Sequence, residues 1–73
     1  MKKLVFVEGM SCGHCTMKVQ SNLGDIPGVA KVEVDLFRKT AMVEGEGEGM
    51  NDAAMRHAVA QAGYRVVRIL GRH

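Results

Sequence analysis

The sequence predicts an α+β fold of order β-α-β-β-α-β, with two helices covering one face of a four-stranded antiparallel sheet. Three observations predict it: two apolar stripes at helical spacing, four short runs suited to strands, and glycine-rich or polar turns between them. The chain has 73 residues, the length of one small domain, which we expect to span residues 1–73.

The first strand and the first helix are predicted on either side of a glycine. Residues 3–8 (KLVFVE) are β-branched and aromatic, as strands are, and Gly9 interrupts them. Ser11 is a residue type that caps helices, and Gly24 is a helix-ending residue. Between them, apolar side chains recur every four residues, at Cys15, Val19 and Leu23. This spacing predicts a helix with one buried face.

A hairpin is predicted in the middle of the chain. Pro27–Gly28 is a turn signal, and residues 30–36 (AKVEVDL) then alternate between apolar and charged side chains, as a half-buried strand does. A short polar turn at Arg38–Lys39 leads to a further strand at residues 40–44.

The last third of the chain predicts a loop, a helix and a strand. Residues 44–49 (EGEGEG) are expected to form a flexible acidic loop, and Asn51 or Asp52 can cap the helix that follows. Its apolar stripe consists of Met55, Ala58, Val59 and Ala62. Gly63 ends the helix, and residues 64–70 (YRVVRIL) read as a strand. The complete order is that of the ferredoxin-like fold.

Composition argues against two kinds of partner. The net charge is only +2 and the basic residues are scattered, which does not favour nucleic acid. The first apolar run has four residues, shorter than the roughly 7–15 of a secretory signal, and no run approaches the ~20 of a membrane span. We therefore expect a cytoplasmic protein that binds no nucleic acid, does not insert into a membrane and keeps its thiols reduced.

The two cysteines, Cys12 and Cys15, stand where the first strand gives way to the first helix. Their sulfurs can converge there, and the positive end of the helix favours thiolate over thiol. Thiolates both bind metals and attack disulfides. The residues alone therefore leave three interpretations open.

A soft-metal carrier is the interpretation that the residues favour. Cu(I) accepts few, soft ligands, and a site with two thiolates stays open to a partner's cysteines. A thiol–disulfide oxidoreductase is the second, although no Trp precedes the pair and the only proline, Pro27, follows the first helix. A structural zinc site is the third, but it needs four protein ligands, and His14, His57 and His73 are poorly placed to complete it. No group of catalytic residues stands out, so we do not expect an enzyme.

The stretch GMSCGHC, residues 9–15, resembles the GM-[ST]-C-x-x-C motif of heavy-metal-associated domains, and nearly the whole chain is similar to small bacterial copper chaperones. Gly28–Val29 and Ala62-Gly63-Tyr64 also fall where this family has matching residues. The resemblance implies Cu(I) delivery in the cytosol, with Cys12 and Cys15 as ligands, to the metal-binding domain of a copper-transporting P-type ATPase. A copper-responsive repressor is a second recipient that it implies. We expect a monomer, with a copper-bridged dimer as the alternative.

Four further residues are expected to support the site: Met10, Ser11, His14 and Tyr64. The family usually tucks the residue at Met10 under the loop as core, so packing is favoured over ligation. In this family the loop that corresponds to Tyr64 lies close to the metal, where the tyrosine hydroxyl can hydrogen-bond to a sulfur or shield it. His14 is expected to be exposed, and its alternative role is an auxiliary ligand when two molecules share copper.

Ser11 bears on which metal is carried. Carriers of Zn(II), Cd(II) and Hg(II) share the fold and the cysteine spacing, and zinc-type sites of the family often add an acidic residue beside the first cysteine. The uncharged Ser11 favours Cu(I), which two thiolates hold with a net charge of −1. Mercury also suits two thiolates, but those carriers are usually periplasmic.

Overall fold

The computed structural model describes residues 2–10, 13–47 and 49–72, with the last residue described by its backbone alone. The elements are β1 (Lys2–Glu8), α1 (Gly13–Gly24), β2 (Val29–Asp35), β3 (Thr40–Gly45), α2 (Asp52–Gln61) and β4 (Arg65–Arg72). Each strand begins within one residue of its predicted start.

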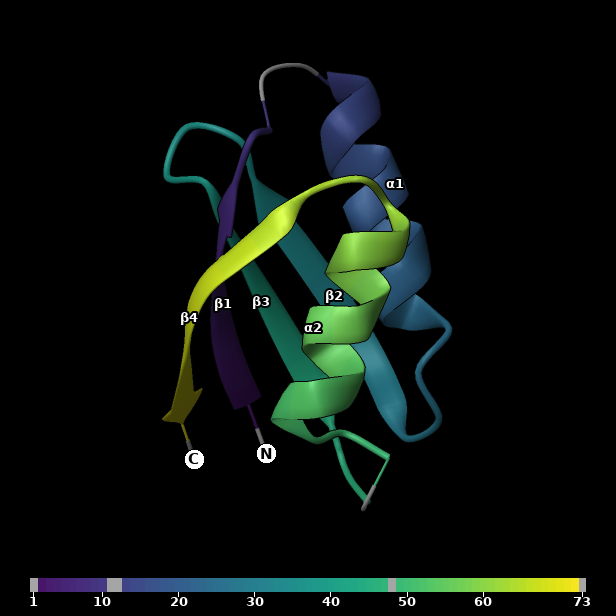
Figure 1. The fold of residues 1–73 in the computed structure, drawn as a ribbon. Coiled ribbons are helices and arrows are strands. Elements are labelled where there is room, and N and C mark those ends of the chain that lie inside the picture. The colour runs from purple at the N-terminus through teal and green to yellow at the C-terminus, as the bar shows by residue number, and fades with distance from the viewer. Residues whose placement is uncertain (1, 11–12, 48, 73) are drawn as a thin grey trace.

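The four strands form one antiparallel sheet in the order β2-β3-β1-β4. Both helices lie on the same face of this sheet, and the opposite face is left uncovered (Figure 1). The ferredoxin-like prediction is therefore confirmed. Within the described part of the chain, no helix has the length and apolar character needed to cross a membrane.

The core lies between the sheet and the two helices. Successive residues of a strand face opposite sides, so β1 turns Val5 and Val7 toward the helices, and both are buried. The predicted helical stripes meet them from the other side: Cys15, Val19 and Leu23 from α1, with Met55, Ala58, Val59 and Ala62 from α2 and its end. The sequence periodicity thus identified the inward face of each helix correctly.

The glycine-rich run after β3 packs closely against the turn before β2. A Cβ on Gly45 would overlap the carbonyl oxygen of Gly28, and one on Gly49 would lie 2.5 Å from the carbonyl oxygen of Pro27. The amide of Glu46 also donates to the Gly28 oxygen at 2.9 Å. The expectation of a flexible loop misses this contact, because the glycines allow two backbone segments to approach each other.

The start of α2 is fixed by two neighbouring side chains. Asn51 is the cap, and its Oδ1 accepts a hydrogen bond of 2.8 Å from the amide of Ala54. The carboxylate of Asp52 instead receives a hydrogen bond of 2.6 Å from Nζ of Lys3 in β1. The two candidate caps therefore have different roles, one within the helix and one between helix and sheet.

The close approach at Gly45 predicts a large cost for a single methyl group. We expect Gly45→Ala to lower the free energy of unfolding by about 1–3 kcal/mol, because the added Cβ overlaps backbone that cannot rotate away. The matched control is Gly24→Ala at the end of α1, where nothing lies within 4 Å of the added Cβ. Its expected effect ranges from none to a gain of about 1 kcal/mol. Urea unfolding measures both, and equal losses would contradict the packing argument.

Candidate metal site

Three connections gather at one end of the molecule: the connection from β1 to α1, the β2–β3 turn, and the turn from α2 to β4 (Figure 1). The amide of Val7 donates to the carbonyl oxygen of Lys39 at 2.9 Å, which joins the end of β1 to the β2–β3 turn. A contact between Gly9 and Tyr64 joins the first connection to the third. We call this region the loop end.

Gly9 occupies a position that other residues fill with difficulty. Its φ is +101°, in the region that favours glycine, and a Cβ there would lie 3.3 Å from Cδ1 of Tyr64. The half-buried ring of Tyr64 therefore lies against the start of the β1–α1 connection. This glycine is needed both for the turn of the backbone and for the approach of the ring.

Two sulfur-bearing side chains on either side of the connection are buried. Met10 is 3% exposed and Cys15 is 8% exposed, and both belong to the same hydrophobic core. Cys15 is the third residue of α1 and shares the inward face of the helix with Val19. Ser11 and Cys12 lie outside the described residues, so convergence of the two sulfurs stays a prediction.

The histidines lie at separate places. His14 is exposed on α1, beside the buried Cys15, and His57 is exposed on α2. His73 lies outside the described residues. Across residues 2–10, 13–47 and 49–72, no three side chains of Cys, His, Asp or Glu are grouped so that they could hold a metal ion.

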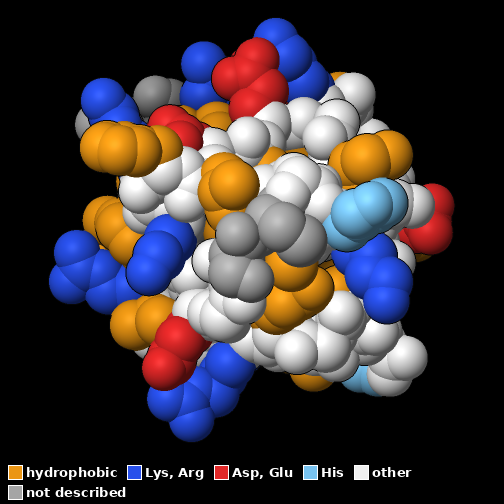
Figure 2. Space-filling view, turned by 90° about the horizontal axis from the view of Figure 1, so that it is seen from above, with side chains coloured by type: hydrophobic (Ala, Val, Ile, Leu, Met, Phe, Trp, Pro, Cys, Tyr) orange, Lys and Arg blue, Asp and Glu red, His pale blue; other side chains and the backbone are white. Residues whose placement is uncertain are grey.

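Apolar side chains are exposed at the loop end. Phe37, at the tip of the β2–β3 turn, is 96% exposed, and a hollow of about 570 Å³ is lined by Met10, Leu36, Phe37 and Lys39. Asp35 holds this turn, since its Oδ1 accepts a hydrogen bond of 3.1 Å from the amide of Arg38. Seen from this end, hydrophobic side chains lie near the centre and along one edge, and both basic and acidic side chains lie at the periphery (Figure 2).

The sequence pattern did not single out Phe37 as part of this surface. Met17, in the second turn of α1, is 67% exposed. The sequence could have identified Phe37 as exposed, because it is an aromatic residue in a short polar hairpin turn, and side chains of such turns are seldom buried in the core. Exposed large apolar side chains beside a binding loop are typical of a surface that meets another molecule.

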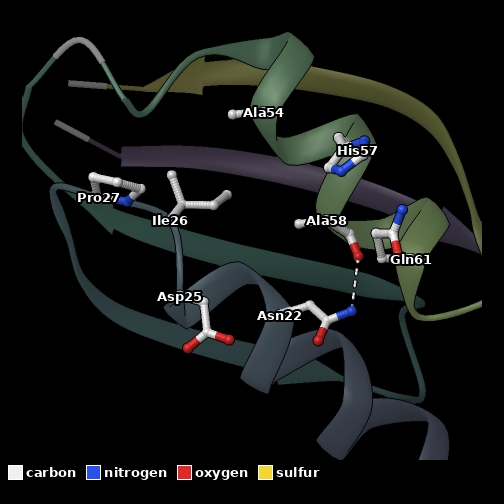
Figure 3. Close-up of a pocket in the computed structure, with 8 residues that line it drawn as sticks. All are labelled: Asn22, Asp25, Ile26, Pro27, Ala54, His57, Ala58 and Gln61. Carbon is white, nitrogen blue, oxygen red and sulfur yellow. Dashed lines mark hydrogen bonds between the residues drawn. The ribbon is translucent and has the colours of Figure 1, made fainter.

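A groove of about 360 Å³ runs between the two helices, away from the loop end (Figure 3). It is lined by Asn22, Asp25, Ile26, Pro27, Ala54, His57, Ala58 and Gln61. Nδ2 of Asn22 bridges the helices by donating to the carbonyl oxygen of Ala58 at 3.1 Å. Asp25 and His57 come from opposite sides of the groove and do not point toward each other, so it has no focused chemical centre (Figure 3).

Comparison with known proteins relates the chain to metal-binding domains. The sequence pattern of the family described as the heavy-metal-associated domain matches residues 4–65. A "Copper chaperone CopZ" of Staphylococcus aureus (strain bovine RF122 / ET3-1) is 38% identical over 66 residues, covering 90% of this chain and 97% of that protein.

Two solved structures extend the similarity to three dimensions. The structure of a "CopZ metallochaperone" matches with a TM-score of 0.86 and 36% identity, covering 92% of this chain and 100% of the other. A copper binding domain from HMA7, a P-type ATPase, matches with a TM-score of 0.86 and 29% identity, covering 97% of this chain and 96% of the other. The chain is therefore similar both to a free carrier and to a domain of a transporter.

The contact between Gly9 and Tyr64 predicts a specific spectroscopic change. We expect Gly9→Ala to lower the free energy of unfolding by about 1–3 kcal/mol, because the backbone is strained and the ring must shift. Gly47→Ala is the control, since Gly47 has a φ of +105° but nothing within 4 Å of the added Cβ. Tyr64 is the only tyrosine and the chain has no Trp, so its fluorescence reports the ring. A change should appear in Gly9→Ala and not in Gly47→Ala.

Proposed function

The chain belongs to the heavy-metal-associated domain family, and we propose from this that it is a copper chaperone that carries one Cu(I) ion on Cys12 and Cys15. It works in the cytoplasm and passes the ion to the soluble metal-binding domain of a copper-transporting P-type ATPase. It is a carrier and not an enzyme.

The observation that carries the proposal is the position of Cys15 at the start of α1, with Cys12 three residues earlier in the sequence. Cys15 lies in the first turn of this helix, where unpaired backbone N–H groups favour a negatively charged sulfur. Two thiolates are a suitable and sufficient ligand set for Cu(I), which accepts low coordination numbers. A third protein ligand is not needed, and its absence from the motif leaves room for an incoming one.

Transfer follows from ligand exchange. Copper binds both sulfurs as thiolates, so loading the site releases any protons that the two cysteines still hold, up to two, and the Cu(I) dithiolate carries a net charge of −1. A thiolate of the recipient then bonds to the copper before one of the original Cu–S bonds breaks, and the released thiolate takes up a proton. Because Cys15 is only 8% exposed, helix and core limit the approach to its sulfur, and the recipient approaches from the solvent side of the loop end.

Met10 and Tyr64 support the site without holding the ion. Met10 is 3% exposed within the core, and its thioether serves as a packing group that anchors the connection. Tyr64 lies against Gly9, and we propose that its hydroxyl hydrogen-bonds or shields a copper-bound sulfur. His14 is exposed and reaches solvent, which suits an auxiliary ligand only when a second molecule shares the copper.

The recipient is proposed from two observations. A copper binding domain of a P-type ATPase has the same fold, so donor and recipient can meet through matching loops. The exposed Phe37, beside the hollow that Met10, Leu36 and Lys39 also line, supplies an apolar contact at the loop end. A copper-responsive repressor is a second recipient. In dilute solution the carrier is a monomer, and a dimer bridged by copper is the alternative.

The ligand assignment predicts the effect of removing each sulfur. We expect Cys12→Ala and Cys15→Ala each to lower the Cu(I) affinity by at least about 100-fold, because one thiolate cannot hold the ion against a competing chelator. Titration of the reduced protein with Cu(I) in the presence of that chelator measures this. Met10→Leu is the control, which keeps the core volume, and it should bind copper as tightly as the original chain.

The same titration separates the alternatives. Zn(II) that displaces Cu(I) at equal buffered concentrations would contradict the metal assignment, and the same comparison with Hg(II) and Cd(II) tests the other soft-metal carriers. Rapid turnover in an insulin-reduction assay with a thiol donor would favour the oxidoreductase instead. Copper binding that survives in both cysteine variants would place the site elsewhere.

The role of Phe37 predicts a kinetic effect without an effect on affinity. We expect Phe37→Ala to slow Cu(I) transfer to the ATPase domain by roughly tenfold, because it removes an exposed aromatic contact of the encounter complex. Its affinity for Cu(I) should not change, since the side chain is 96% exposed. Leu70→Ala is the control, an exposed apolar residue in β4. Stopped-flow transfer with both variants is the measurement, and equal rates would exclude Phe37 from the docking surface.

A further inference from the structure

The face of the sheet that the helices leave uncovered has an apolar centre. Leu4 pairs with Leu70 of β4 on one side and with Met42 of β3 on the other, so the three apolar side chains form a row across the sheet, and Glu33 of β2 ends this row beside Met42. Leu4 and Met42 are half-buried although no element covers them, and Leu70 is 40% exposed. Phe6 lies in the next row of the same face.

That second row has opposite charges at its two ends. The register places Asp35 opposite Thr40, Thr40 opposite Phe6, and Phe6 opposite Arg68. The row therefore runs from a carboxylate on the β2 edge, across a threonine and an aromatic ring, to a guanidinium on the β4 edge. The guanidinium of Arg68 lies over the ring of Phe6, 5.0 Å from its centre.

Most other charges of this face are balanced within the chain. Ion pairs join Lys31 to Glu33 at 2.9 Å, Lys2 to Glu44 at 3.5 Å and Arg65 to Glu8 at 2.8 Å. The hydrogen bond to Glu33 raises the pKa of Lys31, so the ammonium of that pair stays charged at neutral pH. In the part of the chain that the structure describes, no ion pair includes Arg68, and Asp35 meets only Arg38, at 3.8 Å.

We propose that the uncovered sheet face binds a second copy of this chain, in a symmetric dimer whose two-fold axis runs parallel to the strands. Such an axis places the β2 edge of each copy over the β4 edge of the other. Asp35 of each copy then faces Arg68 of its partner, and this pair forms twice. The apolar side chains of each copy, which are Leu4, Phe6, Met42 and Leu70, pack between these pairs. The face is complementary to itself because its charges are opposite at opposite edges.

The dimer leaves the proposed copper sites accessible. Rotation about an axis parallel to the strands keeps the direction along them, so both loop ends lie at the same end of the dimer. No copper and no cysteine takes part in the contact. The inference is therefore independent of the proposed function, and it differs from a dimer in which copper bridges two loops.

We expect the association to be weak. The molecule measures 30 × 20 × 18 Å, so a flat face offers at most about 600 Å² in projection, below the roughly 800 Å² per partner of a standard interface. The exposed ion pairs at the edges of the contact add little to the free energy of association, and salt screens them. The dimer should form at high protein concentration and dissociate as the ionic strength rises.

Sedimentation of the reduced, metal-free protein in the presence of a copper chelator tests the proposal. We expect a monomer–dimer equilibrium that is populated at about 1 mM protein and weakened by 0.5 M salt. Leu70→Glu should abolish the dimer, because it places a carboxylate in the apolar row of the contact. Arg56→Gln on the outer side of α2 is the matched control and should leave the equilibrium unchanged.

A double-mutant cycle tests the charge pairing itself. Arg68→Gln removes the cation, and Asp35→Asn removes the charge but keeps an oxygen that can accept from the amide of Arg38. Each should raise the dimer dissociation constant roughly threefold to tenfold, because two exposed ion pairs are lost in each dimer. The double variant should be no weaker than either single one, since both remove the same pairs.

Three results would overturn the proposal. One is a protein that stays monomeric at about 1 mM and low salt. Another is a dimer that Leu70→Glu and Arg68→Gln do not affect. The third is a dimer that appears only with copper and is lost in Cys15→Ala, since that is the behaviour of a metal-bridged contact. Concentration-dependent amide shifts confined to the uncovered face of β1, β3 and β4 would support it.

Discussion

The burial of Met10 and Cys15 in one core is the constraint on which the loop end depends. The first is 3% and the second 8% exposed, so the connection from β1 to α1 leaves the core at one of them and returns to it at the other. Gly9 permits the turn just before, and the ring of Tyr64 closes against it. The placement of the motif relative to the fold is therefore a result of packing, and a change in the core is transmitted to the loop end.

The two ends of the molecule are built in different ways. At the end opposite the loops, the chain closes on itself through backbone contacts, with Gly45 against Gly28 and the glycine run against the turn before β2. At the loop end, an ordered turn holds Phe37 in solvent. Closure at one end stabilises the sheet, and exposure at the other end leaves Phe37 accessible to the proposed recipient.

Local pattern predicted most of the fold. The strand and helix periods identified the inward residues, since a buried stripe repeats with the geometry of its own element. The cysteine pair was also visible, because the metal preference of thiolates is a local chemical property. Two contacts were not visible in the sequence: the approach of Tyr64 to Gly9 and the passage of Gly45 beside Gly28. Each joins segments that lie far apart along the chain, and the spacing of residues within one element does not predict contacts between distant segments.

By itself, the sequence determined the order of the elements and the residues that face the core, and it predicts thiolate ligands near the start of α1. These depend on the spacing and chemistry of neighbouring residues. Only the tertiary structure decided that Phe37 stays in solvent, that Asn51 caps α2 while Asp52 binds β1, and that Asp35 and Arg68 end one row of the uncovered face. Those outcomes depend on strand register and on which segments meet, and these are properties of the folded chain.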